Sequence, residues 1–165
     1  MDISFKTEQG RFNYRTAGVL IQDGKLLVMQ DENSPYYYVP GGRVSFGEAT
    51  EAALQREIRE ELGIDVVVQR LLWVVESFFE ENRTKELFHE LAFYYLLTLA
   101  DPGILHRGAS FSRREGDQHT LRFTWKELRE LQNLYFYPLF LKQKILDLPI
   151  EVEHIVDTND LTSSV

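Results

Sequence analysis

Three glutamates in one short segment could together hold a metal ion. Glu57, Glu60 and Glu61 stand at positions i, i+3 and i+4, which share one face of a helix. Close carboxylates repel one another, and the dipole near a helix C-terminus disfavours negative charge further. A divalent cation would reverse this balance, and clustered carboxylate oxygens suit a hard ion such as Mg²⁺. A solvated helix surface is the alternative, since glutamate is a good helix former, and the cluster alone does not separate the two.

Residues next to this cluster favour the metal interpretation. The glycines of Pro40-Gly41-Gly42 let the backbone approach a ligand closely, and a carbonyl there could be a further metal ligand. Arg56 lies four residues before Glu60 and could pair with a carboxylate, holding it ionised. Arg43 follows the glycines directly, which makes it our candidate for contact with a substrate phosphate.

The segment from Gly42 to Ile64 resembles the Nudix box. The family pattern is G-x5-E-x7-R-E-U-x-E-E-x-G-U, with U an aliphatic residue, and every defined position matches. At ordinary residue frequencies such a match arises by chance in far fewer than about one in a million chains. The matching residues are Gly42, Glu48, Arg56, Glu57, Ile58, Glu60, Glu61, Gly63 and Ile64.

This resemblance implies a fold, a reaction and a cofactor. The fold would be α/β, an α/β/α sandwich with a mixed β-sheet in which the box forms a loop, a helix and a second loop. The reaction would be hydrolysis of a nucleoside diphosphate linked to another group, a pyrophosphatase activity in which water attacks phosphorus. Mg²⁺ would be the cofactor, with Mn²⁺ as the alternative ion.

The resemblance also implies roles for the box residues. Glu57, Glu60 and Glu61 are the expected metal ligands, and the Gly41 carbonyl is their expected helper. Arg56 resembles the arginine that orients these acids, so we count Arg56, Glu60 and Glu61 as catalytic.

Two further roles lie outside the ligand set. Glu48 is expected to support the site rather than to bind the ion directly. The family often adds an acid from outside the box as metal ligand or general base. Glu115 is our first candidate for it and Glu90 the second.

Other candidates for substrate contact are less specific. Tyr36, Tyr37 and Tyr38 could stack on a base, although strand alternation would put at least one in the core, and we take Tyr38 as the substrate-binding candidate. A basic loop, comprising His106, Arg107, Arg113 and Arg114, could hold phosphate, but we favour a solvated loop. The four histidines lack ligand spacing.

Hydrophobic periodicity and turn residues predict the elements that position these residues. Strands are expected at 16–21, 25–29, 36–39, 66–79, 87–99 and 121–125, and helices at 48–62, 126–131 and 138–146. Asp23-Gly24 predicts a hairpin turn, and Gly63 a helix C-cap. We expect a loop at 101–120.

Length and composition are those of one globular domain. The chain has 165 residues, 44% of them hydrophobic and 27% charged, so we expect a single domain over 1–150 and a polar C-terminal tail over 151–165. There is no cysteine, which excludes disulfides, thiolate zinc sites and cysteine nucleophiles. We expect a cytoplasmic protein, since we find neither a signal-like N-terminus nor a stretch of membrane-span length.

The net charge of the chain limits the classes of partner that it is expected to bind. At a formal −8 the chain is not expected to bind a nucleic acid polymer, and the expected partner is a small nucleoside diphosphate derivative. The sequence leaves a homodimer open.

The rival interpretation is a non-catalytic nucleotide-ligand sensor on the same fold, but we see no added DNA-binding domain and the glutamate set is intact. Isomerisation of an isoprenoid diphosphate is disfavoured because it is expected to need a cysteine. The secondary motifs of several Nudix subfamilies are absent, so the substrate is not predicted.

Overall fold

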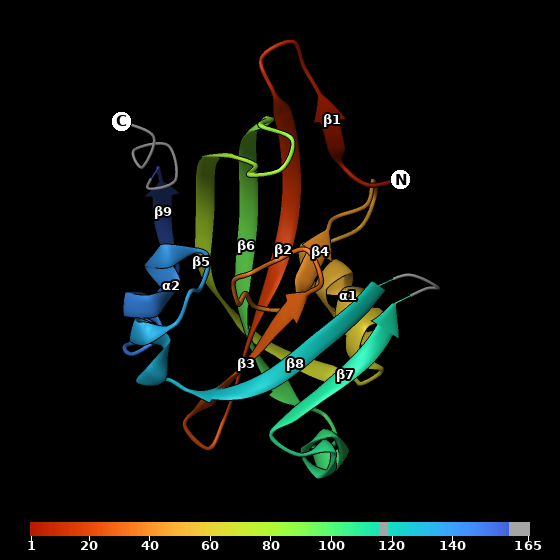
Figure 1. Ribbon diagram of the computed structural model, residues 1–165, viewed down its shortest axis with the longest axis vertical. Helices are drawn as coiled ribbons and strands as arrows, with labels where there is room; N and C mark the ends of the chain where they lie inside the picture. Colours follow the sequence, from red (N-terminus) through yellow and green to blue (C-terminus); the bar gives the residue numbers. More distant parts are fainter. Residues whose placement is uncertain (116–118, 159–165) are drawn as a thin grey trace.

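One long strand organises the fold (Figure 1). β2 pairs in parallel with β6 and, in antiparallel fashion, with β1, β4 and β3. The computed structural model describes residues 1–115 and 119–158, without the side chain of Glu115. The strands are β1 (Ser4–Lys6), β2 (Arg11–Gln22), β3 (Lys25–Asp31), β4 (Gly41–Arg43), β5 (Val66–Glu80), β6 (Leu87–Leu99), β7 (Ser110–Glu115), β8 (His119–Glu127) and β9 (Glu153–Asp157). The helices are α1 (Thr50–Leu62), α2 (Leu139–Lys144) and the 3₁₀ turns η1 (Pro102–Arg107) and η2 (Glu130–Asn133).

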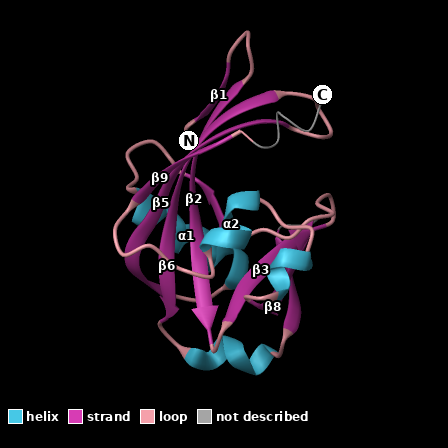
Figure 2. Ribbon diagram, turned by 90° about the vertical axis from the view of Figure 1, so that its left-hand side faces the viewer, coloured by secondary structure: helices cyan, strands magenta, loops and turns pink. Residues whose placement is uncertain are grey.

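The strands form a mixed sheet in the order β7-β8-β3-β2-β6-β5-β9, which confirms the predicted fold class. The β2–β6 and β5–β9 pairs are parallel, and the other pairs are antiparallel. Two hydrophobic clusters fill the interior, one including residues of α1 and the other residues of η2 and α2. Figure 2 shows β2, β5 and β6 running together on one side and β3 and β8 on the other. Alternate residues of β3 belong to different clusters, so α1 and α2 pack against different faces of the sheet. None of the described helices is long and apolar enough to cross a membrane.

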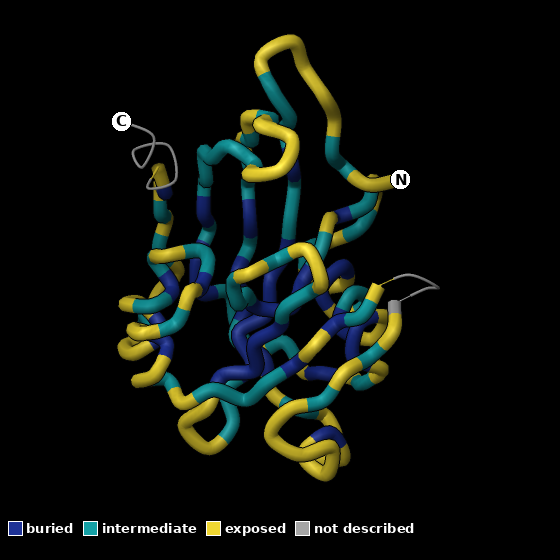
Figure 3. The backbone as a smooth tube through the Cα atoms, in the orientation of Figure 1, coloured by how far each residue is buried: buried dark blue, intermediate teal, exposed yellow. Residues whose placement is uncertain are grey.

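Burial is greatest where the two layers meet, and the sheet extends beyond it (Figure 3). Trp73, Leu20 and Leu54 are at most 1% exposed, whereas the residues at the free ends of β1, β5 and β6 are half-buried or exposed. The extended part of β2 therefore presents side chains that α1 and α2 do not cover completely.

The long predicted elements are confirmed and several short ones are corrected. The hairpin at Asp23-Gly24 has positive φ at both residues, and Gly63 caps α1 in the left-handed conformation. The expected strand at 36–39 is wrong: this segment makes only isolated bridges, because the glycines after it pair with β2 instead. The expected helix at 126–131 is also wrong, since β8 continues to Glu127 and is followed by η2.

The last two corrections concern segments expected to be irregular. The expected loop at 101–120 contains η1 and β7, and β7 pairs with β8. The expected tail beginning at 151 contains β9, which pairs with β5 at the edge of the sheet. The division of the chain into a domain and a tail stays a prediction.

Candidate active site at the α1–β4 edge

The three glutamates of α1 lie at different depths. The apolar stripe of α1 is buried, and Glu61, next to Leu62 of that stripe, is only 8% exposed. The side chain of Glu57 is 17% exposed and that of Glu60 is 56% exposed. The face that the sequence assigns to the glutamates therefore runs from the core at Glu61 to solvent at Glu60.

Arg56 links three of the box acids. Its Nε donates to Glu48 Oε1 at 2.9 Å and its Nη2 to Glu48 Oε2 at 3.0 Å. Its Nη1 donates to Glu57 Oε1 at 2.7 Å and to Glu60 Oε2 at 3.4 Å. The hydrogen bonds from Arg56 lower the pKa of Glu48, so Glu48 stays ionised and fixes the guanidinium. Glu48 thus contacts Arg56 through both carboxylate oxygens, and its supporting role stays a prediction.

The two glycines of β4 bring the backbone against the helix. A Cβ at Gly42 would lie 2.1 Å from Cδ of Glu57, so only glycine lets this carboxylate approach the strand. At Gly41 φ is +155°, and a Cβ would lie 2.2 Å from the Thr16 carbonyl oxygen. Burial raises the pKa of Glu57, against the effect of Arg56. A partly desolvated carboxylate on a bare strand is well placed to gain from a cation.

The donor set suits a hard divalent ion, although the side chains are not gathered at one point. Among the residues the structure describes, no three His, Cys, Asp or Glu side chains form a ready metal cluster. Glu57 and Glu60 both lie against Arg56 instead. Carboxylates with a strand carbonyl nearby remain the ligands that Mg²⁺ prefers, so residue chemistry fits the ion even though the rotamers do not converge.

A second group of polar residues comes from the sheet: two of them, Glu90 and Arg43, were named as candidates from the sequence, but Asn13 and Arg15 were missed. Asn13 and Glu90 are register partners on β2 and β6, and Asn13 Nδ2 donates to Glu90 Oε2 at 2.6 Å. Arg43 Nε donates to Asn13 Oδ1 at 3.0 Å, and Arg15 Nη2 donates to the Gly41 carbonyl at 3.4 Å. The available signal was the alternation of Arg11, Asn13 and Arg15, which indicates a polar strand face.

Arg15 lies in the field of several acidic groups. Burial alone would lower the pKa of Arg15, but the negative charge of Glu90, with smaller contributions from Tyr94, Glu61 and Tyr38, raises it. Arg15 is therefore a permanent cation close to both the box and Glu90. The Gly41 carbonyl, predicted to help bind metal, accepts a hydrogen bond from this cation and keeps a second lone pair.

Tyr38 lies beside this group on the loop before β4. Its hydroxyl donates to Asp31 Oδ2 at 2.7 Å, and burial together with this hydrogen bond raises the pKa of Tyr38. Tyr36 packs edge-on against Tyr38, Tyr135 and Tyr137, with ring centroids 5.0 to 6.0 Å apart. These tyrosines therefore form an aromatic wall, and contact of Tyr38 with a base stays a prediction.

The basic loop serves the helix end. Arg107 Nη1 donates to the carbonyl of Leu62 at 2.8 Å, and the Arg113 guanidinium lies so close to Gly63 that a Cβ there would meet it at 2.1 Å. Cations at a helix C-terminus are stabilising, so these arginines offset the unfavourable position of the glutamates. Arg113 is half-buried, whereas His106, Arg107 and Arg114 are exposed, in keeping with the solvated loop that we favoured. The backbone of Glu115 pairs with His119, and its side chain lies outside the described residues.

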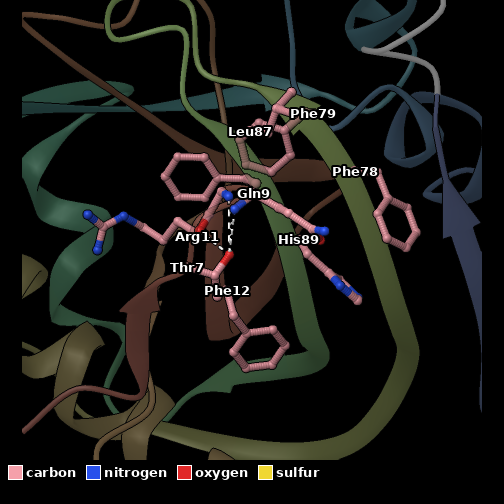
Figure 4. A pocket seen from close by; sticks show the side chains of 10 residues that line it. Thr7, Gln9, Arg11, Phe12, Phe78, Phe79, Leu87 and His89 are labelled. Carbon is pink, nitrogen blue, oxygen red and sulfur yellow. Dashed lines mark hydrogen bonds between the residues drawn. The ribbon is translucent and has the colours of Figure 1, made fainter.

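A separate hollow lies at the free end of the sheet (Figure 4). It has a volume of about 410 Å³ and is lined mainly by aromatic residues of β2, β5 and β6 together with the β1–β2 turn. Phe12 and Phe78 both pack against His89 there, with centroids 5.7 and 4.5 Å away. None of the box residues lines it.

A glutamate-bearing loop–helix–loop against a mixed sheet defines the class of protein, and comparison with known proteins gives the family. The NUDIX domain model matches residues 13–142. The chain therefore belongs to the Nudix family.

Individual relatives are more distant. "ADP-ribose pyrophosphatase" of Methanocaldococcus jannaschii is 40% identical over 63 residues, which is 36% of this chain and 37% of that protein. "Uncharacterized Nudix hydrolase YvcI" of Bacillus subtilis is 26% identical over 120 residues, 73% of this chain and 69% of that protein. Among solved structures, an ADP-ribose pyrophosphatase from Streptococcus suis matches with a TM-score of 0.58 and 18% identity, over 88% of this chain and 98% of that one. This structural likeness supports the fold.

Proposed function

We propose that this protein is a Nudix pyrophosphohydrolase that hydrolyses a diphosphate linkage in a nucleoside diphosphate derivative, with Mg²⁺ held by Glu57, Glu60 and Glu61. The observation that carries the proposal is the Arg56 network. One guanidinium connects Glu48, Glu57 and Glu60 while the bare Gly42 admits Glu57 to the strand. A surface helix of solvated glutamates would need neither the glycine nor the buried acid.

The residues can divide the chemistry between them. Bound Mg²⁺ would neutralise diphosphate charge and lower the pKa of a bound water. A carboxylate outside the ligand set, Glu115 or Glu90, removes the proton of the attacking water. The oxygen of that water forms a bond to phosphorus, and the bridging P–O bond breaks, so the leaving phosphate takes the bonding pair. Arg43 contacts the charged oxygens throughout, and Asn13 holds Glu90 in place.

The substrate class follows from the aromatic wall and from the relatives. Tyr36 and Tyr38 pack edge-on against each other in the segment that leads into β4, and aromatic rings of this kind suit a nucleobase. The relatives named above as ADP-ribose pyrophosphatases suggest ADP-ribose as the first compound to assay. Mn²⁺ is the alternative ion, and the cytoplasmic location and a homodimer stay predictions.

A screen of diphosphate compounds tests the proposal. Nucleotide sugars including ADP-ribose, dinucleotides and modified nucleoside triphosphates are each incubated with the protein and Mg²⁺, and released phosphomonoester is measured. We expect turnover with at least one compound, loss of turnover in excess chelator, and recovery with Mg²⁺ or Mn²⁺. Full turnover in excess chelator would contradict the metal assignment. Binding of a compound without turnover would favour the non-catalytic sensor.

A further inference from the structure

Two arginines face each other across β2 and β4. Arg15 and Arg43 are register partners in this antiparallel pair, so both side chains lie on the same face of the sheet. Like charges directly opposite one another are destabilising in a sheet. The charge of Glu90 offsets part of this repulsion, and an anion between the two side chains would offset more of it.

Each guanidinium is anchored by an uncharged acceptor. Arg43 donates to the Asn13 side-chain amide oxygen, and Arg15 donates to the Gly41 carbonyl. By contrast, Arg11 on the same strand and face is paired with the carboxylate of Glu86 at 3.0 Å. Amide acceptors fix the position of a guanidinium without removing its charge, and each arginine retains further N–H donors.

The position of Arg15 and Arg43 in the fold indicates which kind of anion they would bind. Arg43 directly follows Gly42, whose open side faces Glu57, and the positive charge of Arg15 reaches Glu57 and acts to lower its pKa. Arg56 Nη2 also donates to the carbonyl of Arg43 at 3.1 Å, which ties this strand to the glutamates. An anion at the arginine pair would therefore border the metal site. A guanidinium group binds phosphate oxygens through paired N–H donors. A diphosphate has two phosphate groups, so each of the two arginines could bind the oxygens of one of them.

We propose that Arg15 and Arg43 form a clamp for the diphosphate group of the substrate. The proposal rests on the function above and adds Arg15, which the box does not contain. Asn13 and Glu90 position the two arginines. Asn13 accepts a hydrogen bond from Arg43 and donates one to Glu90, and the negative charge of Glu90 stabilises the positive charge of Arg15.

Binding of methylenediphosphonate, whose P–C–P bridge resists hydrolysis, tests the clamp without turnover. The full chain is titrated at fixed Mg²⁺, and binding is followed by the shift in melting temperature and by calorimetry. We expect Arg15→Gln and Arg43→Gln each to weaken binding about tenfold or more, the range of a lost charge-assisted hydrogen bond. Arg11→Gln is the matched control, since Arg11 shares the strand and face, and it should bind within about twofold of the parent. Inorganic phosphate should bind more weakly than the diphosphonate and lose less on either substitution.

The outcomes separate the clamp from the reaction. Unchanged diphosphonate binding in Arg15→Gln and Arg43→Gln overturns the clamp, even if hydrolysis is found. Arginine-dependent binding in a protein that hydrolyses nothing supports the clamp and overturns the proposed function. Equal losses for phosphate and diphosphonate would mean a general anion site and also overturn the clamp. Should Arg15→Gln fail to fold, Arg43→Gln and Arg15→Lys decide: the clamp requires a tenfold loss in the first and an intermediate loss in the second.

Discussion

At the scale of single residues, Arg56 decides how the glutamates are presented. Its hydrogen bonds to Glu48, Glu57 and Glu60 fix the direction of three carboxylates that would otherwise repel one another. Lysine offers no planar fork with which to do this. The spacing of the box indicated the pairing of Arg56 with an acid, but the sequence singled out Glu60, whereas the shorter contacts are to Glu48 and Glu57.

Gly42 gives the sharpest residue-level prediction. In Gly42→Ala the new methyl group would lie 2.1 Å from the Glu57 carboxyl carbon, so Glu57 must move. Displacement of a catalytic group by about 1 Å can lower activity about 10²-fold, and we expect a loss of that order in kcat/KM. Gly103→Ala is the control, because its nearest neighbour is a flexible Asp101 side chain at 3.2 Å. Equal activity of both variants would remove Glu57 from the site.

The general base can be identified by comparing two acids outside the box. We expect Glu115→Gln to lower kcat by about 10²- to 10⁴-fold with little change in KM, the scale of a lost general base. Glu90→Gln is measured beside it, since Asn13 fixes Glu90 in the sheet part of the site. A larger loss in Glu90→Gln would transfer the role to Glu90. Near-normal kcat in both, with activity abolished in Glu60→Gln or Glu61→Gln, would place the base inside the box.

At the scale of elements, the long helices and strands could be predicted from the sequence and the short ones could not. α1, β5 and β6 carry enough periodic positions to be recognised from the sequence alone, and the structure confirms each within two residues at its ends. The short segment before β4 is aromatic and looks like a strand, but its backbone forms only bridges to Met29 and Phe136. The conformation of such a short segment depends on which distant residues it pairs with, and the propensities of its own residues do not reveal those partners.

α1 itself yields a stability prediction. Its three glutamates carry like charges near the helix end, so Mg²⁺ should raise the melting temperature through binding to the folded state. The triple change of Glu57, Glu60 and Glu61 to Gln should melt no lower than the metal-free parent and lose the response to Mg²⁺. Scanning calorimetry with and without Mg²⁺ measures both. A response that survives in the triple variant would place the ion elsewhere.

At the scale of the whole molecule, the sheet completes a site that the box only begins. Asn13 and Glu90 stand 77 positions apart in the chain and are neighbours only because β2 and β6 pair in parallel. A complete box predicted the candidate metal ligands and their arginine. The arginine pair and the Asn13–Glu90 contact depend on strand order and register, which a single sequence does not reveal.

The stability of the folded protein is expected to fall at acid pH, because the ionised carboxylate of Glu48 accepts hydrogen bonds from Arg56. Hydrogen bonds from Arg56 lower the pKa of Glu48 below its ordinary value of 4.5. A lowered folded-state pKa stabilises the protein above pH 4.5, and this contribution is lost as the pH falls through the lowered value. We expect urea unfolding to show lower stability for Glu48→Gln than for the parent at pH 7, with the difference shrinking below pH 4.5. A difference that stays constant with pH would show that Glu48 acts through packing and not through its charge.

Strand β9 has a consequence for how the protein can be handled. It lies beyond residue 142, where the family match ends, yet it pairs with Trp73 to Ser77 of β5, and Glu153 accepts hydrogen bonds from both Trp73 and Lys144. A chain shortened to the family boundary would leave β5 as a bare, apolar sheet margin. Such margins template pairing between molecules, so trimming this protein to its recognisable core should turn a monodisperse preparation into one that self-associates.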